Sequence, residues 1–206
     1  MRRKIGIFCI VLGVLCLLAA LGFVLYNQWE ARQAEAVAQS LLQTVQLAVN
    51  ENSTQEENGQ APAEDPRLPA DADTPREMAT VQVDGFDCIG VLSVPVLELE
   101  LPVLTDWSYE KLKKAPCLYY GSYYESDFVI AAHNYKGHFA RLSQLLPGDT
   151  VIFTDVHGVA HSYEVVLLET LPATATEEMI TSGFDLSLYT CTTGGGNRIT
   201  VRCRAK

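Results

Sequence analysis

The chain has 206 residues, a length typical of one domain with accessory segments. It contains 6 cysteines and has a formal net charge of −10. Residues 81–206 alone carry 9 basic and 15 acidic side chains. Because a nucleic-acid-binding face must be basic to neutralise phosphates, this acidic balance argues against nucleic acid as a partner.

The N-terminus predicts a membrane anchor. No charged residue occurs from Ile5 to Tyr26, and at ~1.5 Å per residue a helix of this length crosses the ~30 Å core of a bilayer. The preceding tip, residues 1–4, is basic, so we expect it to stay in the cytoplasm while the rest of the chain lies outside the cell. A cleaved signal peptide, with the small residues at 20–22 as its site, is the alternative, although signal h-regions usually run about 7–15 residues.

Two connecting segments follow the predicted span. Residues 27–50 are rich in Ala, Gln, Glu and Leu with apolar residues at helical spacing, which predicts a helical stalk continuing from the membrane. A short coiled-coil contact between two copies is the alternative, but it would have few heptads. Residues 51–80 are acidic and hold four prolines, so they bury too little apolar surface to fold and are predicted to be a disordered tether.

From Val81 onward the pattern changes to short β-type runs. We expect two strands broken at Pro95, the second alternating from Val96, and a buried strand that ends at His133. A hairpin around residues 157–158 and a last pair of strands follow, with helical turns only at 138–146 and 176–183. Many short strands with few helices predict a mainly β domain over residues 81–206, a closed or nearly closed barrel of about eight strands.

Cys191 is the candidate nucleophile. It ends an apolar strand beside a glycine triplet at 194–196, where a side chain is both fixed and exposed. Free cysteine is often buried and inert, so a catalytic one needs a partner that favours the thiolate or exchanges a proton. Of the four histidines, His133 is best placed, because it ends a buried strand, whereas His138 is predicted to lie on a solvent-facing loop.

Arg198 is the candidate for the positive group that acyl transfer needs. It begins the strand after the glycine turn, so in a hairpin it lies opposite the end of the strand that carries Cys191. A guanidinium is always charged and offers several donors to an oxyanion. The alternative is an exposed edge-strand arginine, which is the interpretation given to Arg202 and Arg204.

These motifs resemble those of the sortases, membrane-anchored cysteine transpeptidases of Gram-positive bacteria. The family's nucleophile motif is Thr-Leu-x-Thr-Cys, and residues 187–191, Ser-Leu-Tyr-Thr-Cys, match it except at the first position. The family histidine follows an apolar strand, as in Ala-Ala-His-Asn at 131–134, and its arginine follows a variable loop, as in Asn-Arg-Ile-Thr-Val-Arg at 197–202. The resemblance covers residues 81–206 and leaves the class open between a compact class B-like and a class D-like enzyme.

The resemblance implies an eight-stranded β-barrel in which Cys191 attacks the Thr–Gly bond of a Leu-Pro-x-Thr-Gly-like sorting signal. An amine from a peptidoglycan precursor or a pilin lysine then resolves the thioacyl enzyme, so the implied partners are surface proteins or pilins that carry the signal. It also implies His133 as acid/base, Arg198 as the residue that binds the signal and steadies the oxyanion, and Thr190 as a residue that helps hold the substrate or the loop. No cofactor is implied. Some family members bind calcium, but no carboxylate loop here can be assigned to a metal.

Other functions remain open for the same residues. A catalytically silent binding module would pair Cys191 with Cys203 in a disulfide. Four cysteines lie outside the span, an even number compatible with bridges: Cys88, Cys117, Cys191 and Cys203. A cysteine hydrolase would use water in place of the amine. A metal site built from His133, His138, Cys191 and Cys203 is a weaker alternative, since no Cys-x-x-Cys or His-x-x-x-His spacing supports it.

Overall fold

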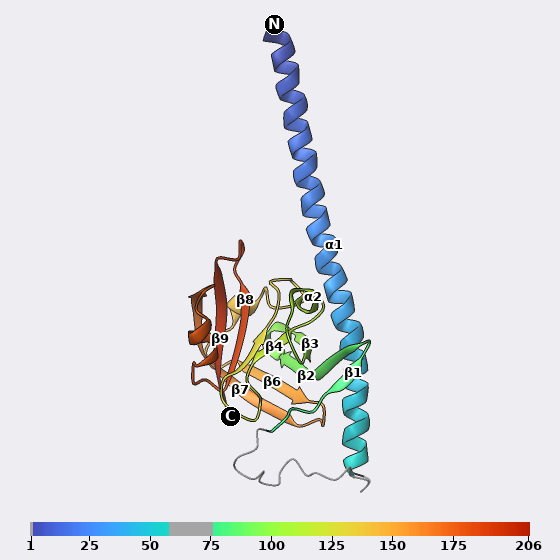
Figure 1. Ribbon diagram of the computed structural model, residues 1–206, viewed down its shortest axis with the longest axis vertical. Helices are drawn as coiled ribbons and strands as arrows, with labels where there is room; N and C mark the ends of the chain where they lie inside the picture. The colour runs from blue at the N-terminus through green and yellow to red at the C-terminus, as the bar shows by residue number, and fades with distance from the viewer. Residues whose placement is uncertain (1, 58–75) are drawn as a thin grey trace.

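A single helix of 56 residues, α1 (Arg2–Glu57), runs from one end of the molecule down the side of a β-barrel (Figure 1). This computed structural model describes residues 2–57 and 76–206. Residues 51–57, assigned to the tether from the sequence, belong to α1, and residues 58–75 of that predicted tether lie outside the described residues.

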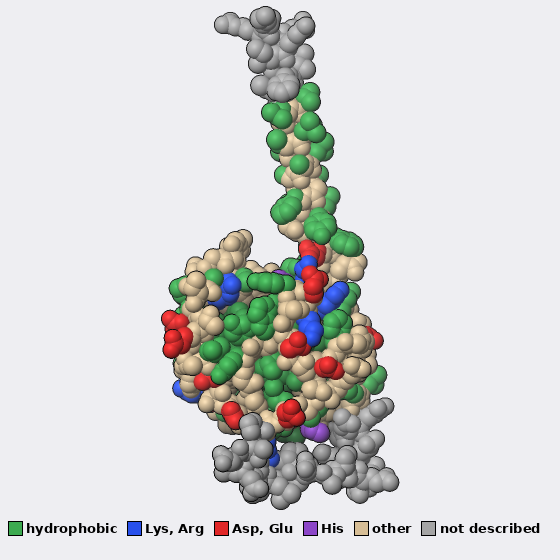
Figure 2. Space-filling model, in the orientation of Figure 1, with side chains coloured by type: hydrophobic (Ala, Val, Ile, Leu, Met, Phe, Trp, Pro, Cys, Tyr) green, Lys and Arg blue, Asp and Glu red, His purple; other side chains and the backbone are tan. Residues whose placement is uncertain are grey.

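The N-terminal part of α1 is apolar and stands clear of the barrel. Within the described range Ile10–Asn50, an 18-residue window reaches a mean hydropathy of 2.4, and none of that window is buried (Figure 2). By length and composition this helix is able to cross a membrane. The finding is compatible with the single membrane-spanning anchor expected at residues 5–26.

The described residues form one sheet that closes on itself. Its strand order is β1-β2-β3-β4-β5-β8-β9-β7-β6, and β6 also pairs with β2. The pairing closes β2 to β9 into an eight-stranded barrel with β1 as a short addition, which confirms the predicted mainly β, closed eight-stranded fold. The strands are β1 (Val81–Val83), β2 (Phe86–Val94), β3 (Leu99–Leu104), β4 (Cys117–Tyr120), β5 (Phe128–Ala131), β6 (Thr150–Asp155), β7 (Ala160–Pro172), β8 (Leu186–Cys191) and β9 (Asn197–Ala205).

Short helical turns connect the strands. Pro95 has no N–H to donate to a strand ladder. As predicted, it separates β2 from β3, and it opens the 3-10 turn η1 (Pro95–Leu97). The second strand begins at Leu99 instead of Val96, because Glu98 takes a left-handed conformation with φ 48°. The remaining helices are α2 (Tyr109–Leu112), η2 (Leu142–Gln144) and α3 (Thr176–Ile180).

The second half of α1 packs on the barrel. Its buried residues recur every three or four positions, which gives the helix one apolar face. These residues are no more than 8% exposed: Ala34, Ala38, Leu41, Val45 and Val49. Burying a Leu or Val side chain stabilises a fold by about 1.5–3 kcal/mol, so this contact contributes substantially to the stability of the domain. The segment predicted as a stalk at residues 27–50 therefore lies against the barrel wall.

Arg202 is buried, contrary to its interpretation as an exposed edge-strand arginine. It is 1% exposed, because α3 covers this outer face of β9. Its Nε donates to Glu169 Oε1 at 2.7 Å, and its two terminal nitrogens donate to Ser187 Oγ at 2.8 Å and to the Glu178 carbonyl at 2.7 Å. Arg202 therefore ties α3 to the barrel.

Arg202→Ala is expected to lower the free energy of unfolding by roughly 3–5 kcal/mol, because it leaves the buried partners of a charged network unsatisfied. Chemical denaturation of the full chain in detergent, followed by fluorescence, measures the loss. Arg204 lies two residues further along β9 on an exposed end, so Arg204→Ala is the control and should change stability by less than about 1 kcal/mol. Equal effects of the two substitutions would contradict a structural role for Arg202.

Candidate active site

Cys191 is the half-buried thiol at the end of β8. Three other cysteines of the barrel are fully buried, and burial raises the pKa of Cys88 to about 11 and those of Cys117 and Cys203 to about 12. Thiolates react and thiols do not, so those three groups are unreactive in the folded domain. Among the barrel's free cysteines, Cys191 is the one that reaches the surface.

The β8–β9 hairpin rules out the proposed disulfide between Cys191 and Cys203. Its register pairs Cys191 with Arg198 and Cys203 with Leu186. The two cysteines therefore lie five strand positions apart, about 16 Å at ~3.3 Å per residue, whereas a disulfide needs Cα atoms within about 7 Å. Both thiols are free.

His133 follows the end of β5, the strand that pairs with the Cys191 strand β8. β5 and β8 are parallel, and their last pair is Ala131 with Tyr189. His133 and Cys191 each lie two residues beyond this pair, at the same end of the two strands. β5 itself ends at Ala131, two residues before the predicted end, and His133 begins the loop that follows. The register brings together two residues that are 58 positions apart in the chain.

The His133 ring is half-buried. It stacks on Tyr135 with 4.8 Å between ring centroids, and its Nε2 has no hydrogen-bond partner among the described residues. Burial lowers its pKa, the Glu30 carboxylate opposes this by raising it, and Lys113 lowers it further. The lowered pKa keeps a neutral, proton-accepting imidazole available near neutral pH.

Arg198 faces Cys191 across the first pair of the hairpin. Its Nη1 donates to the carbonyls of Gly195 at 2.9 Å and Asn197 at 3.1 Å, which holds the guanidinium against the turn. Gly194 and Gly195 have φ of 87° and 74°, a left-handed backbone that favours glycine, so the glycine triplet is what allows this turn. The guanidinium keeps further N–H groups for a ligand.

Thr190 lies outside the pocket. It is 1% exposed, and its hydroxyl donates to the Ala132 carbonyl at 2.8 Å. Substrate contact, one of the two roles expected for it, does not fit this position. The hydroxyl instead links β8 to the residue before His133, which fits the other role, holding the loop.

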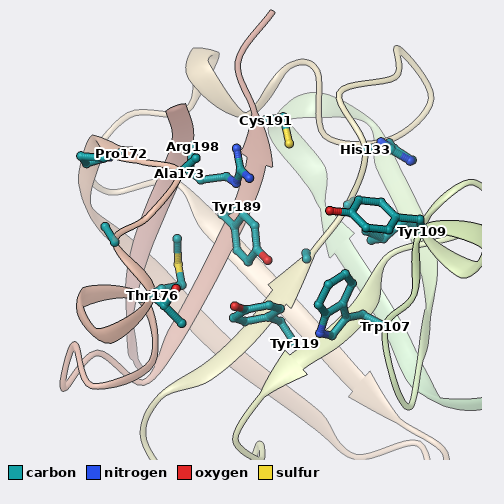
Figure 3. Close-up of a pocket in the computed structure, with 15 residues that line it drawn as sticks. Trp107, Tyr109, Tyr119, His133, Pro172, Ala173, Thr176, Tyr189, Cys191 and Arg198 are labelled. Atoms are coloured by element: carbon teal, nitrogen blue, oxygen red, sulfur yellow. The ribbon is translucent and has the colours of Figure 1, made fainter. Parts of the chain in front are cut away.

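The three candidate side chains surround one pocket of about 140 Å³, and Figure 3 shows Cys191 between Arg198 and His133. Aromatic rings form its opposite wall, with Tyr189 against Tyr119 at 5.2 Å and Tyr119 against Trp107 at 5.7 Å between centroids (Figure 3). We call Trp107, Tyr119 and Tyr189 the aromatic wall. Sequence reasoning missed it, because three separate chain segments supply the rings and only the fold brings them together.

His138 is fully buried, so the predicted solvent-facing position is wrong. Its loop folds beneath α1, and the ring approaches the Ala34 backbone without the geometry of a full hydrogen bond. Burial lowers the pKa of His138 to about 4, and the neighbouring His133 adds to this effect. His138 is therefore a neutral packing residue at physiological pH.

The stability of the domain should fall with acid through His138. The pKa of this group is about 4 when folded and 6.5 when unfolded, so the unfolded state binds the extra proton in this range. The resulting stability is fully present above pH 6.5 and is lost on the way down to about pH 4, a change on the order of 3 kcal/mol. The free energy of unfolding, measured at several pH values, should fall less steeply with acid in His138→Phe than in wild type. Parallel plots of this free energy against pH for the two proteins would refute the linkage.

The weaker metal alternative finds no support here. In residues 10–50 and 76–206, no group of three or more His, Cys, Asp or Glu side chains is placed to hold a metal ion. Cys203 is also separated from Cys191 by the hairpin register.

Comparisons with known proteins identify the family of the chain. A family model described as the Sortase domain matches residues 92–206. Sortase C1 from Streptococcus suis is 28% identical over 58% of this chain and 73% of its own, with a TM-score of 0.50. A search of curated proteins finds no match.

Two further solved structures are similar in fold. A sortase D5 transpeptidase from Clostridium perfringens is 16% identical over 83% of this chain and 99% of its own, with a TM-score of 0.59. Sortase C from the same organism, solved with the C-terminal cell wall sorting motif, is 19% identical over 80% of this chain and 89% of its own, with a TM-score of 0.53.

Proposed function

Because the chain belongs to the sortase family, we propose that it is a cysteine transpeptidase that cleaves a sorting signal through a thioacyl intermediate on Cys191. The observation that carries the proposal is the strand register. It places Arg198 opposite Cys191, and His133 and Cys191 each follow two residues after the last pair of β5 with β8. A nucleophile, an acid/base and a fixed cation thereby border one pocket, which is the constellation that acyl transfer needs.

The reaction would proceed in two balanced steps. His133 takes the proton of the Cys191 thiol, and the resulting thiolate attacks the carbonyl carbon of the scissile Thr–Gly bond. The tetrahedral oxyanion then collapses as the C–N bond breaks. His133 gives a proton to the leaving amine, and a thioester remains on Sγ. The acceptor amine then attacks the thioester, His133 takes its proton, and a new amide forms as the thiolate leaves.

Arg198 would bind the signal and stabilise the oxyanion. Its Nη1 is engaged by the carbonyls of the glycine turn, so its position is fixed before substrate arrives. Preorganised donors cost no reorganisation at the moment of reaction, and a guanidinium can present two parallel N–H bonds to one carbonyl region. We assign to it no separate proton transfer, because guanidinium stays protonated.

A Leu-Pro-x-Thr-Gly-like signal is the substrate that we propose. The aromatic wall offers apolar surface beside Cys191, and flat rings suit leucine and proline side chains. Sortase C of Clostridium perfringens was solved with a cell wall sorting motif, which supports the same substrate class for this chain. Surface proteins or pilins that carry the signal would be the partners, and a peptidoglycan precursor or a pilin lysine would supply the amine.

The enzyme would work outside the cell, on the membrane surface. The basic tip at residues 1–4 favours a cytoplasmic N-terminus, and α1 then carries the barrel to the other side. Figure 1 shows that β8 ends at the end of the barrel from which the apolar part of α1 extends. The pocket would therefore open toward the bilayer, where an anchored substrate is held.

A peptide assay tests the proposal. The full chain is incubated with a Leu-Pro-x-Thr-Gly peptide, with and without triglycine or a lysine amine, and the products are read by mass spectrometry. We expect cleavage after threonine and, with amine present, a ligated product. Cleavage without ligation at any amine concentration would identify a hydrolase, and an intact peptide would refute both enzymatic functions.

A further inference from the structure

The loop that carries His133 lies outside the sheet, unlike its two proposed partners. Cys191 and Arg198 are strand residues fixed by the β8–β9 ladder, whereas His133 follows the end of β5. No side-chain hydrogen bond to its Nε2 fixes the ring among the described residues. The orientation of the ring therefore depends on how residues 133–141 are packed.

This loop folds on itself and links His133 to buried side chains. The Phe139 N–H donates to the His133 carbonyl at 3.2 Å, and the His138 N–H donates to the Tyr135 carbonyl at 2.9 Å. Tyr135 stacks on His133 and also meets the His138 ring, 5.7 Å away. A shift of His138 or Phe139 would consequently move the ring of His133.

The first docked turns of α1 cover this loop directly. His138 is fully buried beside the Ala34 backbone, and Phe139 belongs to the same core cluster as Ala38. Gly137 meets Glu35 so closely that a Cβ there would lie 2.9 Å from the Glu35 Cγ. Helix α1 and the loop 133–141 are therefore closely packed against each other.

Charged groups join the helix to the same region. Glu30 lies 3.7 Å from the Lys113 ammonium, and Figure 2 shows acidic and basic side chains gathered where α1 meets the barrel. The charged and titratable groups that act on the His133 region are Glu30 and Tyr26 from α1, Lys113 after α2, and Tyr135 and His138 from its own loop.

We propose that residues 30–38 of α1 are a positioning element of the active site, which holds the loop 133–141 and through it the ring of His133 in place against Cys191. The anchor helix then does more than retain the enzyme at the membrane, because catalysis requires the helix to be docked on the barrel. The inference rests on the proposed acid/base role of His133. It assigns a function to a segment that looks, from sequence, like a plain connection.

The first test compares two alanines of α1 in the full chain in lipid nanodiscs. Ala34 is 3% exposed and lies against His138, whereas Ala36 is exposed on the same helix. Ala34→Leu should lower kcat at least tenfold with KM changed less than about threefold, because the aromatic wall is untouched. Ala36→Leu should match wild type. Equal kcat for the two folded variants would overturn the inference.

A second test applies if Ala34→Leu does not fold. The Glu30 anion favours protonated His133 and Lys113 disfavours it, so Glu30→Gln should shift the His133 inflection of the kcat/KM profile to lower pH and Lys113→Gln to higher pH. Profiles that coincide with wild type would overturn the inference. Full activity in His133→Ala would instead overturn the proposed function beneath it, so the two failures are distinguishable.

Discussion

Cys191→Ala is expected to reduce cleavage of a sorting-signal peptide by about 10⁴-fold or more, since loss of the nucleophile removes the covalent route entirely. The substitution removes one sulfur atom from a half-buried strand end, so the barrel should keep its fold. Peptide turnover by the purified full chain, with circular dichroism as the check on folding, gives the result.

The matched controls are the buried thiols. Cys88→Ala and Cys203→Ala remove a sulfur atom from the core, where the pKa of each thiol is about 11 and about 12, so neither can serve as nucleophile at neutral pH. Both variants should lose some stability and retain most turnover. Retained turnover in Cys191→Ala would remove the basis of the mechanism.

Arg198→Ala is expected to lower turnover by roughly 10²–10³-fold, the usual cost of removing one preorganised oxyanion donor. Arg198→Lys should recover little, because an ammonium keeps the charge but loses the planar fork and the two bonds that hold it on the Gly195–Asn197 turn. Turnover of the same peptide across the variants measures both effects.

Arg204→Ala is the appropriate control for Arg198, since Arg204 is an exposed arginine of the same strand. Arg202 is unsuitable, because its buried network would confound activity with stability. Nearly wild-type turnover in Arg198→Lys would mean that this residue supplies only a positive field. Nearly wild-type turnover in Arg198→Ala would exclude it from the site.

The barrel could be predicted because its signals are local. The apolar runs before His133 and Cys191 mark two core strands, and Pro95 and the glycine triplet mark breaks, so composition and turn chemistry specify most strands. β1 and β4 were missed, since three or four residues are too few to show alternation. Their pairing comes from the sheet around them.

The candidate site residues that adjoin strand ends could be identified from the sequence, whereas the burial of other residues could not. Cys191, His133 and Arg198 each adjoin a recognisable strand or turn, so their candidacy could be read locally. Burial cannot be read that way: Arg202 and His138 look exposed in the sequence and are covered by α3 and α1, respectively. The packing of α1 on the His133 loop is also a tertiary fact, since more than 90 residues separate the two in the chain.

Intact-protein mass spectrometry shows directly whether Cys191 carries the acyl group. The wild-type chain is mixed with excess Leu-Pro-x-Thr-Gly peptide without amine, quenched in acid within the first turnovers, and digested to locate any adduct. We predict a mass gain equal to the Leu-Pro-x-Thr acyl group on the fragment that contains Cys191, its disappearance when triglycine is added, and its absence in Cys191→Ala. Peptide cleavage with no adduct, or an adduct on another residue, would contradict the mechanism.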